Sequence, residues 1–246
     1  MKICVAQIQA FKGDLLKNTE NHVQWIEVAH TKQANAIFFP ELSLTGYEPT
    51  LAKQLAMDME DTRLNVFQNK SDEHQMLIGV GVPTKQEKGI CISMVIFRPL
   101  IPRTIYFKQY LHADEEPFFV RGENSWKLIE TEKKISLAIC YELSVTEHAE
   151  NAHKQGADIY LASVAKSEAG VEKAYERLRE IAQSYDMIVL MSNCIGFCDD
   201  FEGGGRSTVW NAMGEVVAQL DSKSEGILIF DTETNEIFSS LHPLNS

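Results

Sequence analysis

The chain has 246 residues, of which 44% are hydrophobic and 24% are charged, and its net charge at neutral pH is −12. This balance is typical of a globular protein with a sizeable core, arranged as one large domain or two small ones. The negative charge argues against nucleic acid and anionic membranes as partners, because both repel an acidic protein. No stretch reaches the roughly 20 apolar residues that a membrane-spanning helix needs.

Five cysteines are scattered along the chain: Cys4, Cys91, Cys140, Cys194 and Cys198. Their number is odd and most lie within apolar runs, which is typical of a protein in a reducing compartment rather than of a disulfide framework. The first ten residues lack the charged start and cleavage site of a signal peptide. We therefore expect a cytoplasmic protein. The pair at 194 and 198 lacks a second pair of ligands at metal spacing, so we expect no metal site.

Strand and helix patterns alternate along the first half of the chain. The predicted strands are Lys2–Gln9, Ala36–Phe39, Met76–Pro83, Ile90–Arg98 and Arg103–Phe107. Helices are predicted over Asn18–Ala34 and, in two pieces, over Leu51–His74. The polar turn Lys85–Gly89 predicts that the strands on either side of it pair as a hairpin. Gln109–Gly122 has no periodicity and is expected to be a loop.

The second half repeats the strand–helix–strand order. The predicted strands are Trp126–Glu130, Lys134–Ile139, Ala157–Ser163, Met187–Cys194, Ser207–Trp210, Glu215–Ala218 and Gly226–Phe230. Ser144 and Glu147 have the spacing of a capping box at the start of a helix that ends near Gly156, and a further helix is predicted over Glu172–Tyr185. We expect Gly196–Gly205 to be a loop and the last dozen or so residues a tail. No linker divides the chain, so we predict one α/β domain over residues 1–246 with two helix-covered sheets.

Three residues stand where predicted buried strands end: Glu41, Lys108 and Cys140. Side chains at strand ends can converge on a site, as ligands do at the carboxyl ends of open α/β sheets. Glu41 follows an apolar run that could raise its pKa, as a general base requires, although a solvated loop acid has the same pattern. Lys108 is either an edge residue or a cation directed into a site. Cys140 is either a nucleophile or a packed thiol.

The segments around these three residues resemble signature stretches of the nitrilase superfamily, the carbon–nitrogen hydrolases. They read FFPELSLTGY (38–47), YFKQYLHADEEPFF (106–119) and LAICYELS (137–144). The order Glu, Lys, Cys matches, and the similarity extends over nearly the whole chain. The resemblance implies a four-layer α-β-β-α sandwich, no metal, no organic cofactor, and assembly into a homodimer or a larger homo-oligomer.

The resemblance also implies roles for particular residues. Cys140 would be the nucleophile, Glu41 the general base, and Lys108 a donor to the oxyanion together with the backbone N–H of Tyr141. A second glutamate of the family supports the lysine. Glu116 is favoured for that role by its spacing of eight residues from Lys108, with Glu115 as its competitor.

Residues further from the triad are candidates for contact with the substrate. They are Tyr47, in the first signature stretch, and Ser163 and Lys166, in the loop that follows the predicted strand Ala157–Ser163. Lys166 could bind an anionic group, although solvation at the surface is the simpler interpretation. Many relatives have an Arg-Phe-Pro-Glu run shortly after the cysteine, whereas this chain reads Leu143–Glu147, LSVTE. The missing arginine leaves recognition of a substrate carboxylate open.

These features favour a hydrolase of small linear amides or N-carbamoyl compounds, acting through a thioester with release of ammonia. Two alternatives remain open. One is a nitrilase that acts on a small nitrile, and the other is a catalytically silent relative that serves as a binding or assembly module. The expected partner is a small-molecule amide, without nucleic acid or membrane.

Overall fold

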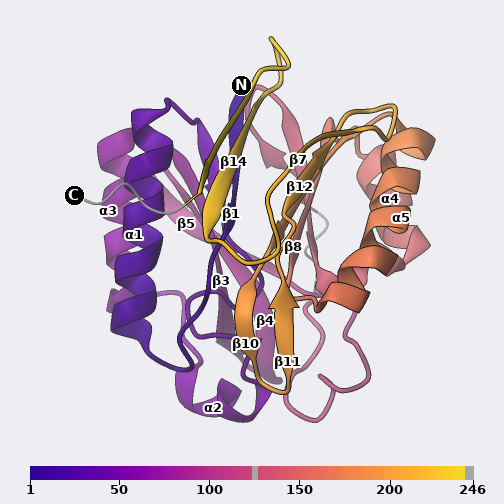
Figure 1. Cartoon of the computed structure of the whole chain (residues 1–246). Coiled ribbons are helices and arrows are strands. Elements are labelled where there is room, and N and C mark those ends of the chain that lie inside the picture. The colour runs from indigo at the N-terminus through magenta and orange to yellow at the C-terminus, as the bar shows by residue number, and fades with distance from the viewer. Residues whose placement is uncertain (124–126, 242–246) are drawn as a thin grey trace.

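A computed structural model describes residues 1–123 and 127–241, and it places two β-sheets face to face between two layers of helices (Figure 1). The larger sheet has seven strands in the order β15–β14–β1–β2–β3–β4–β5, and the smaller has six in the order β13–β12–β9–β8–β7–β6. This arrangement confirms the α-β-β-α sandwich that the resemblance implied. Within the described residues, no helix has the length and apolar character needed to cross a bilayer.

The strands of the larger sheet are β1 (Lys2–Gln7), β2 (Ala36–Phe38), β3 (Leu77–Gln86), β4 (Gly89–Arg98), β5 (Ile101–Phe107), β14 (Gly226–Asp231) and β15 (Ile237–Leu241). Those of the smaller sheet are β6 (Ile129–Glu130), β7 (Lys134–Ile139), β8 (Ile159–Val164), β9 (Ile188–Asn193), β12 (Thr208–Trp210) and β13 (Val216–Gln219). A separate hairpin consists of β10 (Ile195–Cys198) and β11 (Phe201–Gly204). The α-helices are α1 (Leu15–Thr31), α2 (Ala52–Leu55), α3 (Asn65–His74), α4 (Thr146–Lys154) and α5 (Glu168–Tyr185). Short 3₁₀ turns are η1 (Pro49–Leu51), η2 (Thr62–Leu64) and η3 (Cys140–Ser144).

Helices α1 and α3 cover the seven-stranded sheet, and α4 and α5 cover the six-stranded sheet (Figure 1). Helix α1 begins at Asp14, whose side chain accepts a hydrogen bond from the N–H of Lys17, and it buries Trp25 and Ile26 against the sheet. Such a cap satisfies a backbone donor that the first turn leaves without a partner. The apolar face of the helix then explains why it packs on this sheet rather than remaining exposed.

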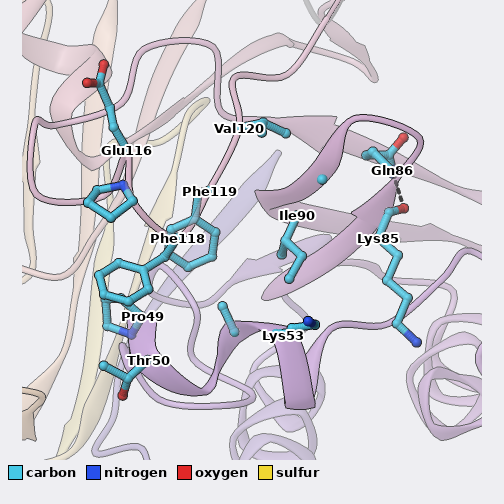
Figure 2. Close-up of a pocket in the computed structure, with 13 residues that line it drawn as sticks. Pro49, Thr50, Lys53, Lys85, Gln86, Ile90, Glu116, Phe118, Phe119 and Val120 are labelled. Atoms are coloured by element: carbon cyan, nitrogen blue, oxygen red, sulfur yellow. Dashed lines mark hydrogen bonds between the residues drawn. The ribbon is translucent and has the colours of Figure 1, made fainter.

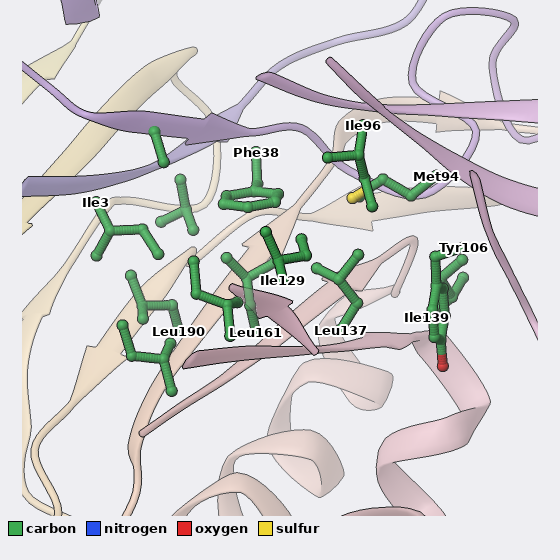
Figure 3. Packing of buried hydrophobic residues seen from close by; sticks show 14 of the residues in the cluster. Ile3, Phe38, Met94, Ile96, Tyr106, Ile129, Leu137, Ile139, Leu161 and Leu190 are labelled. Carbon is green, nitrogen blue, oxygen red and sulfur yellow. The ribbon is translucent and has the colours of Figure 1, made fainter. Parts of the chain in front are cut away.

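The space between the two sheets is filled by apolar side chains from both of them. Figure 3 shows Phe38 and Met94 of the larger sheet opposite Leu137 and Leu161 of the smaller one. Burial of a side chain of this size contributes about 1.5–3 kcal/mol. This layer therefore holds the sheets together, with an added hydrogen bond from the hydroxyl of Ser192 in β9 to the carbonyl of Ala6 in β1 at 2.6 Å.

Strand directions bring particular ends to one edge of the molecule. β2 is parallel to β3, and β5 runs in the same direction because two antiparallel pairings, β3–β4 and β4–β5, separate them. β7 is parallel to β8, which is parallel to β9. The loops after β2, β3 and β5 therefore lie at one edge of the larger sheet. The loops after β7, β8 and β9 likewise lie at one edge of the smaller sheet.

Gly81 in β3 lets the chain after β2 lie against the sheet. A Cβ atom at this position would lie 2.4 Å from the carbonyl oxygen of Pro40 and 2.5 Å from the nitrogen of Leu42, which is closer than side chains tolerate. The N–H of Leu44 donates to the carbonyl of Gly81 at 3.1 Å. Gly81 thus allows a close approach of backbone to backbone beside Glu41.

Two expectations about the strands are wrong. Residues 237–241 are not part of a tail, because β15 pairs with β14 along the edge of the larger sheet; the rest of the expected tail, residues 242–246, lies outside the described residues. The strand, IFSSL, has only five residues and alternates between exposed and half-buried positions, so it lacks the long apolar run that marks a buried strand. Gly196–Gly205 is not an open loop either, because most of it forms the β10–β11 hairpin.

Candidate active site

Glu41, Lys108 and Cys140 meet at the edge where the strand ends lie. Glu41 follows β2 and Lys108 follows β5, both in the seven-stranded sheet, whereas Cys140 follows β7 in the six-stranded sheet. The hydroxyl of Ser163 donates to the carbonyl of Phe39 at 2.9 Å and so links the two sheets beside Glu41. The site therefore draws its residues from both layers of the sandwich.

Lys108 lies between two carboxylates. Its Nζ is 2.7 Å from Oε1 of Glu41 and 2.6 Å from Oε1 of Glu115, and all three side chains are almost completely buried. The hydroxyl of Tyr47 donates to Oε1 of Glu115 at 3.0 Å, and the N–H of His112 donates to its Oε2 at 2.8 Å. Buried charges need such partners, because an isolated charge loses its hydration without compensation.

The second glutamate of the cluster is Glu115, so the choice of Glu116 by spacing was wrong. Glu116 is exposed and pairs with Arg121 at 3.2 Å. The backbone explains the difference. The carbonyl of Glu115 accepts from the N–H groups of Phe118 and Phe119, and this turn directs Glu115 inward and its neighbour outward.

The buried cluster sets the protonation of its members. Burial raises the pKa of Glu41 above its usual value, while the charge of Lys108 opposes the rise. Burial acts to lower the pKa of Lys108, but the charges of Glu41 and Glu115 outweigh it and raise this pKa, so the ammonium keeps its proton. Among the described residues, Oε2 of Glu41 has no hydrogen-bond partner, which leaves it available to accept a proton.

Cys140 begins the 3₁₀ turn η3 and has a φ of 47°. A left-handed backbone is unfavourable for a residue with a side chain, and such strain is found at active sites. Its Sγ lies 3.8 Å from the carbonyl oxygen of Ala165. Burial and the nearby Glu41 raise the pKa of Cys140 to about 11, although Lys166 and Lys108 lower it. The resting thiol therefore carries its proton and needs a base to become a nucleophile.

The predicted capping box after Cys140 is absent from the structure. Ser144 belongs to η3, and α4 begins after Val145 without a side-chain cap. In its place, the carboxylate of Glu142 accepts a hydrogen bond from the N–H of Ile139 at 2.7 Å. The turn that carries the cysteine is thus stabilised from within.

The remaining candidates lie around this cluster in different ways. Tyr47 contacts Glu115 directly, and Tyr141 is exposed next to Cys140 with its ring 5.4 Å from that of His112. Ser163 is buried and its hydroxyl is already bonded to the backbone, so the structure does not offer it to a substrate. Lys166 is half-buried and has no ion-pair partner among the described residues, and its charge lowers the pKa of Cys140.

The sequence spacing of Cys194 and Cys198 raised only the question of a metal site, whereas the structure packs them with Ala165, whose carbonyl oxygen lies near the Cys140 thiol. The thiols of Cys194 and Cys198 lie 3.3 Å apart and form a small apolar cluster with Ala165, against which Tyr47 packs. They come together because the β10–β11 hairpin folds back toward the site, a feature that the glycine-rich composition concealed. No group of three or more potential ligands for a metal occurs in the part of the chain that the structure describes.

A surface pocket of about 800 Å³ lies next to the loop that carries Glu115. Figure 2 shows Phe118 and Phe119 lining it opposite Pro49, with the carboxylate of Glu116 pointing away from these rings. Neither Cys140 nor Lys108 lines this pocket. It is therefore adjacent to the cluster and separate from the reacting groups.

The two neighbouring glutamates provide a matched pair for mutation. We expect Glu115→Gln to lower kcat by about 100-fold, because loss of its charge lets Lys108 move, and small misplacements of a catalytic group have effects of this size. Glu116→Gln should leave kcat within about twofold, as is usual for exposed ion pairs. Steady-state kinetics of the two variants and the wild type measure the difference. Equal losses in both variants would contradict the assignment of Glu115.

Comparison with known proteins shows the family of this chain. A family model described as carbon-nitrogen hydrolase matches residues 2–238. The chain belongs to this family, part of the nitrilase superfamily.

Individual relatives are distant. A glutamine-dependent NAD(+) synthetase from Aquifex aeolicus is 24% identical over 246 residues, which cover 96% of this chain and 43% of that protein. The chain thus spans less than half the length of this relative. A protein described as the hydrolase in the agr operon of Staphylococcus aureus is 23% identical over 245 residues, covering 96% of this chain and 93% of that one.

Solved structures extend the likeness to three dimensions. An amidase from Nesterenkonia sp. AN1, which has an active-site cysteine, matches with a TM-score of 0.86 at 20% identity. The match covers 96% of this carbon–nitrogen hydrolase and 94% of the amidase. At this level of identity the likeness concerns the fold.

Proposed function

We propose that this carbon–nitrogen hydrolase cleaves small linear amides or N-carbamoyl compounds through a thioester on Cys140, with release of ammonia. The observation that supports the proposal most is the buried ammonium of Lys108, held by Glu41 and Glu115 next to a protonated thiol. A cation in a dry site can stabilise the negative charge that develops when a carbonyl is attacked.

The reaction begins when Glu41 takes the proton of the Cys140 thiol. The sulfur attacks the amide carbonyl carbon, and the tetrahedral oxyanion accepts hydrogen bonds from Lys108 Nζ and from the backbone N–H of Tyr141. The carbon–nitrogen bond then breaks, and Glu41 returns the proton so that ammonia leaves and a thioester remains. Such covalent catalysis divides one difficult step into two easier ones.

Water completes the cycle. Glu41 removes a proton from a water molecule as it attacks the thioester carbonyl, and the thiolate leaves and recovers that proton. An amide gives ammonia and a carboxylic acid, whereas an N-carbamoyl compound gives ammonia and a carbamic acid, which decomposes to an amine and CO2. Both routes regenerate the free enzyme and need no oxidant or further reactant. One glutamate serves both half-reactions, which is consistent with its free Oε2 atom and its raised pKa.

The test is ammonia release from a panel of small amides, N-carbamoyl amino acids, N-carbamoyl amines and nitriles. L-Glutamine belongs in the panel because a glutamine-dependent synthetase is among the relatives. We expect release from amides or N-carbamoyl compounds by the wild type and none by Cys140→Ala. Release from nitriles alone would identify a nitrilase, and no release by a folded wild type would favour a silent binding module.

Each amide should be paired with an analogue that carries a carboxylate. Lys166 is the charged candidate beside Cys140, and a preference for the anionic analogue that disappears in Lys166→Met would assign it to substrate binding. The expected homodimer or larger homo-oligomer and the cytoplasmic location remain predictions.

A further inference from the structure

A buried carboxylate that the proposed reaction does not use lies two residues after the nucleophile. Glu142 is completely buried, and its oxygens accept three hydrogen bonds. Its Oε1 accepts from the N–H of Gln109 at 2.6 Å, and its Oε2 accepts from the N–H of Ile139 at 2.7 Å and from the hydroxyl of Tyr106 at 2.8 Å. Charged acceptors make hydrogen bonds about twice as strong as neutral ones.

Two of these bonds join the chain segments that carry the reacting groups. Gln109 directly follows Lys108 at the end of β5, and Ile139 directly precedes Cys140 at the end of β7. These strands belong to different sheets, so no backbone ladder connects them. The carboxylate of Glu142 therefore spans the gap between the lysine segment and the cysteine segment.

We propose that Glu142 is a positioning residue, whose ionised carboxylate holds Lys108 and Cys140 at their working separation. The inference rests on the proposed function, since it concerns the same nucleophile and oxyanion donor. Glu142 itself is not a catalytic residue, because it contacts the backbone next to the reacting groups and not the groups themselves.

A chain of buried hydrogen bonds supports the ionised form. The hydroxyl of Tyr106 also lies 2.9 Å from Nε2 of His148, and Nδ1 of His148 lies 2.9 Å from the hydroxyl of Tyr160. Burial lowers the pKa of His148 to about 3, so this ring is neutral and has one proton to donate. One arrangement satisfies every atom: Tyr160 donates to His148, His148 donates to Tyr106, and Tyr106 donates to Glu142.

The carboxyl group can lose this role within an accessible pH range. Burial raises the pKa of Glu142 to about 7, although its three hydrogen bonds and the charge of Lys108 lower it. The titratable and charged groups that face Glu142 from the surrounding elements are Tyr106 on β5, Lys108 and Tyr110 in the following loop, His148 on α4 and Tyr160 on β8. The pKa of each of the three tyrosines is raised and that of His148 is lowered, so Glu142 is the group among them that changes charge near neutrality.

Glu142→Gln is the direct test. In the variant, the NH2 group of the glutamine would face the backbone N–H of Gln109 or that of Ile139, each of which now donates to a carboxylate oxygen. The hydrogen-bonded link between the lysine segment and the cysteine segment would therefore be lost. The measurement is the rate constant for alkylation of Cys140 by iodoacetamide, followed by intact mass well below the melting temperature. This readout needs no substrate, so it remains valid even if the proposed function fails.

We expect Glu142→Gln to alkylate at least about tenfold more slowly than the wild type at pH 7.5, because a displaced Lys108 no longer stabilises the thiolate. With an active substrate, kcat should fall by about 100-fold, the effect of a small misplacement, while KM changes less than threefold. Glu147→Gln, a matched change at an exposed glutamate five residues away, should leave both rates within twofold. If folded Glu142→Gln had the same alkylation rate constant and the same kcat as the wild type, the proposal would be overturned.

Tyr106→Phe is the second variant, in case Glu142→Gln does not fold. It keeps both backbone hydrogen bonds and removes one donor to the carboxylate, which should raise the pKa of Glu142. The ratio of variant to wild-type alkylation should therefore fall as the pH decreases, from near unity at pH 8.5 to about one fifth at pH 6. A ratio independent of pH, with only the melting temperature reduced, would show a purely structural role and overturn the proposal.

Discussion

Replacing Lys108 with methionine should abolish measurable turnover and destabilise the fold. Removal of a single oxyanion donor typically lowers kcat by about 10²–10³, and here the same change releases Glu41 and Glu115 from their common partner. Two buried carboxylates would remain without a cation, and the loss of one partner from a buried ion pair costs about 3–5 kcal/mol. Ammonia release and urea denaturation measure the two effects.

The destabilisation should depend on pH. Without Lys108, the pKa of Glu41 in the folded state rises further above its value in the unfolded chain. A raised pKa contributes stability at low pH that disappears as the pH rises through that value, so Lys108→Met should be less impaired at pH 5 than at pH 8. A loss of stability that is the same at pH 5 and pH 8 would contradict the idea that ionised carboxylates without a cation destabilise the variant.

Two further variants separate charge from packing. Adding Glu115→Gln to Lys108→Met should restore part of the stability at pH 8 and none of the activity. Lys53→Met makes the same substitution at an exposed lysine, and it should change neither quantity appreciably. Recovery of turnover in the double variant would show that the oxyanion is held by other groups.

Glu41→Gln should lower kcat/KM by about 10²–10⁴, the usual contribution of general acid–base catalysis. In the wild type, Glu41 must be ionised to take the thiol proton, so activity should rise with pH through its pKa. Because burial raises that pKa, the rise should lie above the range of an ordinary carboxyl group. The pH profile of kcat/KM measures the pH at which this rise occurs.

The variant should show a different profile. Without the base, the thiol ionises only as the pH approaches its own pKa, which lies below the wild-type value of about 11 because the charge of Glu41 no longer raises it. Residual alkylation should increase about tenfold per pH unit below that pKa. Glu48→Gln is a matched control in the same loop, where Glu48 is buried and pairs with Lys12 at 2.6 Å. If Glu48→Gln also abolished the rise of kcat/KM with pH, the group that titrates would not be Glu41.

The strand ends were the part of the site that the sequence predicted well. Glu41 follows Phe38–Pro40 and Cys140 follows Lys134–Ile139, and apolar runs of this kind determine where a buried strand stops. The convergence of these ends came from the resemblance to the family, because spacing along the chain does not fix which strands become neighbours.

The loops were predicted less well, for physical reasons. Glu115 and Glu116 have the same local composition, and only the turn to Phe118 and Phe119 decides which of them points inward. Ser144 has the residue type of a helix cap, but the buried Glu142 stabilises the turn before it and α4 starts later. Distant contacts also fix both turns, because Tyr47 donates to Glu115 and Gln109 donates to Glu142, and such contacts outweigh a local preference.

The net charge of the Lys108 cluster also affects product release. With Glu41 and Glu115 ionised around one ammonium, the cluster carries one net negative charge. A neutral amide enters without repulsion, whereas the carboxylic acid formed from it becomes an anion beside two carboxylates. Like charges at short range in a poorly solvated site repel each other strongly. For the proposed reaction, hydrolysis thus converts a compatible ligand into one that the site expels, which favours product release and opposes the reverse reaction.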